Sequence, residues 1–356
     1  MGELPEPDAA SGNVDASRLD ALRAWLADVL PQPMTAIAPA SVDASFRRYF
    51  RVWLAEAVVV PAQGERACTL IAMDAPPSRE DCRAYVAVAK LLLAAGVHAP
   101  AVLAKDLRQG FLLLTDLGTR MYLDALDEAT APALYGDASA ALVRWQLASR
   151  DGQLRPYDEA LLRGELDLFP DWYVARHLGV VLNIAQKAVL DRAFRSILDN
   201  NLAQPRVFVH RDYHSRNLMV VAPNPGVLDF QDAVYGPVTY DLVSLLRDAY
   251  IDWDEEHQID WAVRHWQRAR DAGLPVGGDF ADFWRDFEWM GVQRQLKVLG
   301  IFARLFHRDG KDGYLKEMPR VMGYLRAACA RYRELMPLLR LLDELEQRQP
   351  VAGFTF

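Results

Sequence analysis

VFVHRDYHSRNLMVV (residues 207–221), followed by GVLDFQD (residues 226–232), is the most informative stretch of this sequence. Apolar, β-like residues flank a polar loop that carries Asp212 and Asn217, and Asp229 follows the next β-like run. The three polar residues are separated by 5 and 12 positions. Short crossovers between strands would bring their side chains to one cleft, so the pattern predicts a rigid, loop-rich site.

Carboxylate and amide oxygens in this order are suited to phosphoryl transfer. One carboxylate can take the proton of an acceptor hydroxyl, while an oxygen ligand and a second carboxylate hold Mg²⁺ on the phosphates of a nucleotide. The alternative is that Asp212 and Asn217 are turn residues and that Asp229 caps a strand end. Because several residue types stand at fixed spacing in a strand–loop–strand context, we favour a kinase site.

The first third of the chain alternates between helical and strand-like patterns. Residues 1–16 have the composition of a disordered segment, and Leu19 to Leu30 repeat at helical spacing. β-like runs at 46–52 and 67–73 precede a helix at 81–96, and two short strands lie on either side of Gly110. We therefore expect residues 17–117 to form a β-rich N-lobe.

Residues 118–356 change to long helical stretches. Helices are expected at roughly 131–150, 156–178, 180–202, 254–272, 279–308 and 314–347. The loop-rich stretch described above interrupts them. The sequence thus predicts an α+β fold with a small β-rich N-lobe and a larger, mainly helical C-lobe.

Charge and composition exclude several classes of protein. The 356 residues carry 40 basic and 48 acidic side chains, a net charge of -8 without a polybasic block, so nucleic acid and anionic membrane are not expected as partners. No apolar run reaches the ~18 residues that span a bilayer. The three cysteines are spaced neither for a disulfide framework nor for zinc. We expect a cytoplasmic protein that acts as a monomer on a small molecule.

The motif and its surroundings resemble the aminoglycoside phosphotransferase family, a branch of the protein-kinase-like superfamily, over nearly the whole chain after residue ~30. The resemblance implies a two-lobed kinase fold that uses ATP and Mg²⁺ to phosphorylate small-molecule hydroxyls. It implies that Asp212 is the catalytic base and that Asn217 and Asp229 are Mg²⁺ ligands. His210 would be a structural residue of the catalytic loop, and Asp241, in GPVTYDLVSLLRD (236–248), would brace that loop through backbone hydrogen bonds.

The hinge between lobes is also suggested by the resemblance. GVHAPAVLAKD (96–106) and GFLLLTDLG (110–118) are similar to the segments that approach it in the family. The backbone of three hinge residues would then contact adenine: Thr115, Asp116 and Leu117.

One position departs from the family pattern. The strand before the first N-lobe helix usually ends in a lysine that binds the α- and β-phosphates, and Met73 stands there. Arg47 and Arg51 share one strand face with Tyr49, so either could replace that cation. The turn from Asp43 to Phe46, including Ser45, would cover the phosphates. The alternative is that the arginines are solvated edge-strand charges.

Four strings resemble one subgroup, the bacterial anomeric kinases for N-acetylmuramate and N-acetylglucosamine: SFRRYFR (45–51), MDAPP (73–77), DFQDAVYGPVTYDLVSLLRD (229–248) and RQLKVLGIFARL (294–305). This resemblance implies transfer to the C1 hydroxyl of a cell-wall amino sugar during peptidoglycan recycling. A kinase for an aminoglycoside, choline or a ketosamine is an alternative. Because Met73 replaces the usual lysine, a third alternative is a non-catalytic nucleotide-binding protein. The intact set of Asp212, Asn217 and Asp229 argues against it.

An amino-sugar site needs carboxylates for hydroxyls and an aromatic face for the ring. Asp232, three residues after Asp229, and Trp172 are candidates, although helix packing is an alternative for Trp172. In the helix at 279–308, four basic residues fall within about 80° and form one stripe: Arg294, Lys297, Arg304 and Arg308. We expect Arg294 and Arg304 to meet the lactyl carboxylate of N-acetylmuramate; the alternative is a solvent-facing stripe.

Overall fold

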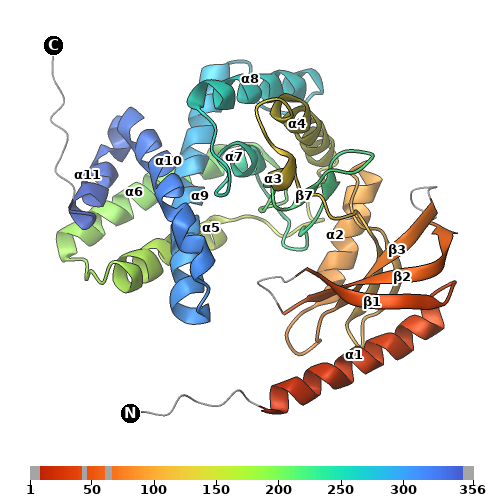
Figure 1. Ribbon diagram of the computed structural model, residues 1–356. Coiled ribbons are helices and arrows are strands. Elements are labelled where there is room, and N and C mark those ends of the chain that lie inside the picture. Colours follow the sequence, from red (N-terminus) through yellow and green to blue (C-terminus); the bar gives the residue numbers. More distant parts are fainter. Residues whose placement is uncertain (1–8, 42–45, 61–65, 348–356) are drawn as a thin grey trace, which may run out of the picture. The chain divides into compact units, whose positions relative to one another are not determined.

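The computed structural model of the chain describes residues 9–41, 46–60 and 66–347. The chain divides into two compact units (Figure 1). The first is formed by the residues up to Leu93 together with Ala99–Gly118, and the second by Ala94–His98 together with the residues from Thr119 onward. The first contains an antiparallel sheet and the second is mainly helical, so the α+β prediction is confirmed.

Five antiparallel strands make up the sheet of the first unit. Their order is β1 (Met34–Ser41), β2 (Arg48–Val59), β3 (Arg66–Asp74), β5 (Phe111–Thr115) and β4 (Val102–Asp106). The sequence predicted every strand except β1. That strand lies at the edge of the sheet, where Pro39 is tolerated, and its alanines give a weak strand signal.

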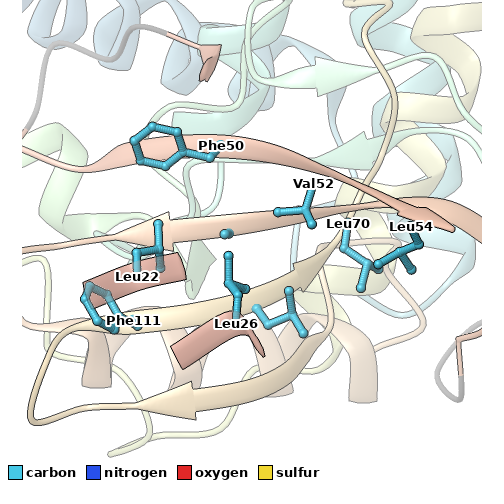
Figure 2. Packing of buried hydrophobic residues seen from close by; sticks show 9 residues of the cluster. Leu22, Leu26, Phe50, Val52, Leu54, Leu70 and Phe111 are labelled. Carbon is cyan, nitrogen blue, oxygen red and sulfur yellow. The ribbon is translucent and has the colours of Figure 1, made fainter. Parts of the chain in front are cut away.

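One face of this sheet is covered by α1 (Ala9–Val29) (Figure 2). Leu22 and Leu26 are fully buried against a cluster of strand residues: Phe50, Val52, Leu54, Leu70, Ala72, Phe111 and Leu113. Because side chains alternate along a strand, Tyr49 and Arg51 lie on the other face of β2. The helix begins at Ala9, so residues 9–16 are helical rather than disordered; no apolar repeat marks these first turns.

The second helix of this region, α2 (Cys82–Ala94), ends before Gly96, whose φ of +70° is the left-handed conformation that favours glycine. This is the stop that the sequence predicted.

The second unit is built around α9 (Phe280–Asp309). This helix packs most extensively against five others: α5 (Glu159–Leu168), the π-helix η1 (Phe169–His177), α6 (Ile184–Ala203), α7 (Tyr240–Leu246) and α10 (Met318–Arg331). Gly300 lets the backbones approach closely, since a Cβ there would lie 2.5 Å from the carbonyl oxygen of Leu168. Most of the middle of α9, including several polar residues, is therefore buried.

The remaining helices are α3 (Tyr122–Ala125), α4 (Ala131–Leu147), α8 (Glu255–Asp271) and α11 (Met336–Leu345), with 3₁₀ turns η2 (Asp312–Glu317) and η3 (Arg333–Leu335). The single helix expected at 314–347 is divided at Tyr332, which has an extended backbone, and Pro337 stands in the first turn of α11. No helix in the described part of the chain combines the length and apolar character needed to cross a bilayer.

Candidate active site

Two short β-ladders hold the motif that the sequence singled out. β6 (Arg206–Val209) pairs with β9 (Val234–Pro237), and β7 (Leu218–Met219) pairs with β8 (Gly226–Val227), both antiparallel. Asp212 and Asn217 lie in the loop between β6 and β7, and Asp229 follows β8 after one residue. All of these elements belong to the second unit.

Two hydrogen bonds bring the three polar residues together. The side-chain amide of Asn217 donates to the main-chain carbonyl of Asp212 at 3.0 Å. The amide of Leu228 donates to the carbonyl of Asn217 at 2.9 Å, so Asp229, the next residue, lies beside Asn217. The loop therefore holds a carboxylate, an amide oxygen and a second carboxylate at one place.

The backbone of the motif is strained at two points. Arg211 and Asp229 have φ values of +79° and +61°, in the left-handed region that costs a non-glycine residue about 1–2 kcal/mol. The carboxylate of Asp241 offsets this cost at Arg211. It accepts the amides of His210 (2.6 Å) and Arg211 (2.9 Å), one on each oxygen. Asp241 thus fixes the backbone directly before Asp212.

His210 is neutral and links two backbone segments of the motif. Burial lowers the pKa of this histidine to about 4. Its Nδ1 faces the amide of Asp212 at 3.3 Å and accepts from it, which leaves the proton on Nε2 to donate to the carbonyl of Leu228 at 2.9 Å. His210 therefore connects the backbone at Asp212 with the backbone at Asp229.

Asp212 is half-buried and ionised. Loss of solvent raises the pKa of its carboxyl, but the positive charges of Lys297 and Arg211 outweigh this effect, and the pKa lies below its usual value. The side chain thus has the charge state of a base.

A buried ionic network includes Arg211, the residue directly before Asp212. The guanidinium of Arg211 and the hydroxyl of Tyr157 both donate to the carboxylate of Glu165. The ammonium of Lys297 lies 3.1 Å from Glu165 and 2.9 Å from the hydroxyl of Tyr240. Burial disfavours the charged form of both side chains. The opposite charge of the partner outweighs this effect, so the pKa of Glu165 is lowered and that of Lys297 is raised.

Residues 36–280, more than half of the chain, match the family described as the phosphotransferase enzyme family. The chain belongs to this family. The family resemblance inferred from the motif is therefore confirmed.

Several relatives of this phosphotransferase are similar over most of its length. A protein of Pseudomonas aeruginosa is 53% identical over 284 residues, 80% of this chain and 83% of the relative. One from Neisseria meningitidis serogroup B is 49% identical over 293 residues, 81% and 87% of the two chains. Both relatives are named N-acetylmuramate/N-acetylglucosamine kinase.

Solved structures share the fold at low sequence identity. Choline kinase LicA from Streptococcus pneumoniae gives a TM-score of 0.59 at 10% identity, covering 89% of this chain and 100% of that one. An ADP-bound aminoglycoside phosphotransferase, APH(2'')-Ib, gives 0.54 at 14% identity, covering 85% and 97%. These likenesses show the protein-kinase-like fold that the sequence predicted.

Asp232 lies close to the catalytic centre of the phosphotransferase. Its side chain is exposed. The amide of Gln231 donates to Asp229 at 2.8 Å and contacts the carboxylate of Asp232 at 3.4 Å, and the Arg211 guanidinium lies 3.5 Å from the main-chain carbonyl of Asp232. Trp172 is half-buried on η1, and no contact within the described residues joins it to this centre.

The basic stripe expected on α9 is not a single surface. Lys297 is buried and paired with Glu165, and exposed Arg308 pairs with Asp309 at 2.7 Å. Arg294 is also buried; it contacts the carbonyl of Arg247 at 3.4 Å and forms no ion pair within the described chain. Arg304 is half-buried, and burial lowers its pKa. The four cations therefore have four different environments.

In the first unit, Arg51 is bound to the segment expected to be the hinge. Its guanidinium donates to both carboxylate oxygens of Asp116, at 2.6 and 3.0 Å. Thr115 exchanges bonds with Ala101: its amide donates to the Ala101 carbonyl and its hydroxyl accepts the Ala101 amide. The side chains of Arg51, Thr115 and Asp116 are thus engaged with protein. Ser45 lies outside the described residues.

The other two arginines at the start of β2 have different partners. Arg48 points to the α1 face and, with Arg18, neutralises the fully buried carboxylate of Asp74. Arg47 lies 3.5 Å from the carboxylate of Glu80, just before α2, and is largely buried. Next to this pair, Arg79 stacks over the ring of Phe46. The segment at 46–47 is therefore attached to the segment at 79–80.

Sequence reasoning did not identify the roles of Glu165, Lys297 and Glu80. Lys297 was counted in the stripe, although its position between Leu296 and Val298 in a strongly apolar part of α9 is a signal of a buried cation. Its partner lies on another helix, and only the fold brings the two together.

Proposed function

We propose that this phosphotransferase transfers the γ-phosphoryl group of ATP to the C1 hydroxyl of N-acetylmuramate, N-acetylglucosamine or both. The observation that carries the proposal is the assembly of Asp212, Asn217 and Asp229 through two hydrogen bonds. The names of relatives near 50% identity support the choice of sugar.

Asp212 would act as the base. As the C1 oxygen of the sugar attacks the γ-phosphorus, the hydroxyl proton passes to the Asp212 carboxylate and the bond to ADP breaks. The depressed pKa keeps this carboxylate ionised at neutral pH. Asp241 and His210 would act as positioning groups, because they hold the backbone on both sides of Asp212.

The oxygen atoms of Asn217 and Asp229 fit Mg²⁺. Carboxylate and amide oxygens are ligands that Mg²⁺ accepts, and it usually takes only one or two carboxylates besides substrate phosphates. The described residues contain no group of three or more His, Cys, Asp or Glu side chains arranged for a metal. Bound there, the ion would neutralise charge on the phosphates of ATP.

Arg47 is the better candidate for the phosphate cation that Met73 cannot supply. Tyr49 pairs with Met73 across β2 and β3, and Arg47 directly precedes β2, two residues before Tyr49. Arg51, the other candidate, is held by Asp116 through two hydrogen bonds. Glu80 would orient Arg47, as the carboxylate partner of a kinase lysine does. The backbone of Thr115, Asp116 and Leu117 would bind adenine.

Asp232, Trp172, Arg294 and Arg304 remain our candidates for the acceptor side. Asp232 has the strongest support, because its exposed carboxylate is next to Asp229 through Gln231. Arg294 has more support than Arg304: burial lowers the pKa of His214, two residues after Asp212, and the positive charge of Arg294 lowers it further. The proposal includes a monomer that acts in the cytoplasm, a compartment that free cysteines suit.

The test is an ADP-release assay of the purified full chain with ATP and Mg²⁺. N-acetylmuramate and N-acetylglucosamine should be turned over, while their methyl glycosides, in which C1 carries no free hydroxyl, should not. Turnover of the methyl glycosides would overturn transfer to C1. Turnover of kanamycin or choline in place of the sugars would favour the alternative kinases, and no turnover of any acceptor would favour a nucleotide-binding protein.

A further inference from the structure

Arg51 forms a closed set of hydrogen bonds with the hinge segment. Besides its two bonds to Asp116, its guanidinium donates to the carbonyl of Gly118 at 2.8 Å. The amide of Gly118 donates to Asp116 at 2.9 Å. One arginine and one carboxylate therefore fix both ends of the Asp116–Gly118 backbone, and we call these residues the hinge clasp.

The hinge clasp is well sheltered. The side chains of Arg51 and Asp116 are only 17% and 5% exposed. The pair is bidentate, the geometry that restricts both partners most. The hydrogen bond to Asp116 raises the pKa of Arg51. Gly118 adopts a φ of +87°, so the chain turns sharply where the clasp ends.

The clasp leaves the main chain between its ends without protein partners. The amide and carbonyl groups of Asp116 and Leu117 make no hydrogen bond with the described residues, whereas the amide of Thr115 donates to the carbonyl of Ala101. The side chain of Leu117 is buried. A rigid stretch of unpaired donors and acceptors on a firmly held backbone is a preorganised recognition element.

We propose that Arg51 and Asp116 are positioning residues that make this backbone select adenine over guanine. The inference rests on the proposed function, because it assigns the base to this segment. Adenine offers a donor at N6 and an acceptor at N1, and guanine reverses the two. A backbone that cannot shift its donor and acceptor leaves buried groups unpaired with the wrong base.

The experiment compares ATP and GTP with the full chain, by calorimetric binding and by kcat/KM. Wild type should favour ATP by tenfold or more, about the effect of one hydrogen bond. Arg51→Met and Asp116→Asn should each reduce the ATP-to-GTP ratio by about tenfold. The sugar KM should not change, and the double exchange Arg51→Asp with Asp116→Arg should recover part of the preference.

Arg48→Met is the matched control. Arg48 is on the same strand and also pairs with a buried carboxylate, but it faces α1. The proposed role of the hinge clasp would be overturned by a wild type that binds ATP and GTP equally well. It would also be overturned if the clasp variants weakened binding of both nucleotides equally, or if the control changed the ATP-to-GTP ratio as much as they do. If one of the two clasp variants does not fold, the ATP-to-GTP ratio of the other still tests the proposal. Nucleotide binding can be measured without the acceptor sugar. If the sugar is not phosphorylated, the proposed function fails, but the binding experiment still tests this inference.

Discussion

The ammonium of Lys297 lies 3.1 Å from the carboxylate of Glu165, and both side chains are more than nine-tenths buried. Glu165 also accepts from Arg211, the residue before Asp212 that stands in a left-handed conformation. The pair on α5 and α9 thus supports the strained backbone at the catalytic centre. Removing either charge would leave the other buried with fewer partners.

A double-mutant cycle should detect this coupling. Lys297→Met and Glu165→Gln should each cost about 3 kcal/mol of unfolding free energy, and the double variant should cost less than their sum by more than about 1 kcal/mol. Urea denaturation measures all four proteins. The control is the partly exposed pair of Arg163 and Asp167 on α5, for which we expect about 0.5 kcal/mol or less. Equal coupling in both cycles would contradict a special role for the buried pair.

Asp212→Asn should lower kcat by about 10² or more, because an amide cannot take the acceptor proton. The fold should persist, since Asn217 bonds to the main-chain carbonyl of residue 212 rather than to its carboxylate. Steady-state kinetics and a thermal melt test both points. Asp232→Asn, also close to the centre, should mainly raise the sugar KM. Turnover by Asp212→Asn within a few-fold of wild type would remove Asp212 from the mechanism.

The catalytic motif could be predicted because its residues lie close together in sequence. Asp212, Asn217 and Asp229 are joined by bonds within one loop and two short ladders. The two faces of β2 were also predictable, since alternation is a local pattern, and Phe50 and Val52 are indeed in the core.

Pairs between distant parts of the chain could not be predicted in this way. Arg51 and Asp116 are 65 positions apart, and nothing in either residue's neighbours marks the other as its partner. The π-helix at Phe169–His177 has the same composition as an ordinary helix, so periodicity predicted one continuous element. Long-range pairing and local helix type depend on how the elements pack, as η1 packs against α9, and a single sequence does not display this packing.

The phosphate role of Arg47 can be separated from a structural role. Arg47→Met should weaken binding of ATP and ADP about tenfold or more but leave binding of adenosine unchanged, since only the phosphate groups would contact the guanidinium. Adding Met73→Lys should restore part of the loss. Calorimetry of the three ligands measures this, with exposed Arg83→Met as the control. Equal weakening of adenosine would indicate that Arg47 only supports the fold.

Acid should destabilise the protein through a histidine buried in neutral form. Burial lowers the pKa of His265 to about 3 from an ordinary value near 6.5, so between these values the unfolded chain binds one more proton than the folded one. Stability therefore rises with pH in this window, by up to about 1.4 kcal/mol per unit for this residue. It is fully present above pH ~6.5 and declines on acidification.

His265→Gln should remove that part of the slope. Urea denaturation between about pH 5 and about pH 7 measures it, across the upper end of the window that the histidine shift defines. His257→Gln is the control, because His257 is on the same helix but exposed. The Nδ1 atom of His265 is 2.9 Å from the hydroxyl of Ser139, and glutamine can retain such a bond. An unchanged slope would show that His265 does not titrate on unfolding.

Arg294 and Arg304 make different predictions for the sugar, although both were chosen for the lactyl carboxylate. Ten residues of helix separate them by about 15 Å, so one carboxylate meets only one of them. We favour Arg294, whose positive charge contributes to the lowered pKa of His214. Arg294→Ala should weaken N-acetylmuramate use relative to N-acetylglucosamine use by ~1.5–3 kcal/mol, as expected for a charge-assisted hydrogen bond, whereas Arg304→Ala should not. The ratio of kcat/KM for the two sugars is the measurement. An equal loss for both sugars would make Arg294 a structural cation behind the loop, and a selective loss in Arg304→Ala would move the carboxylate to the C-terminal half of α9.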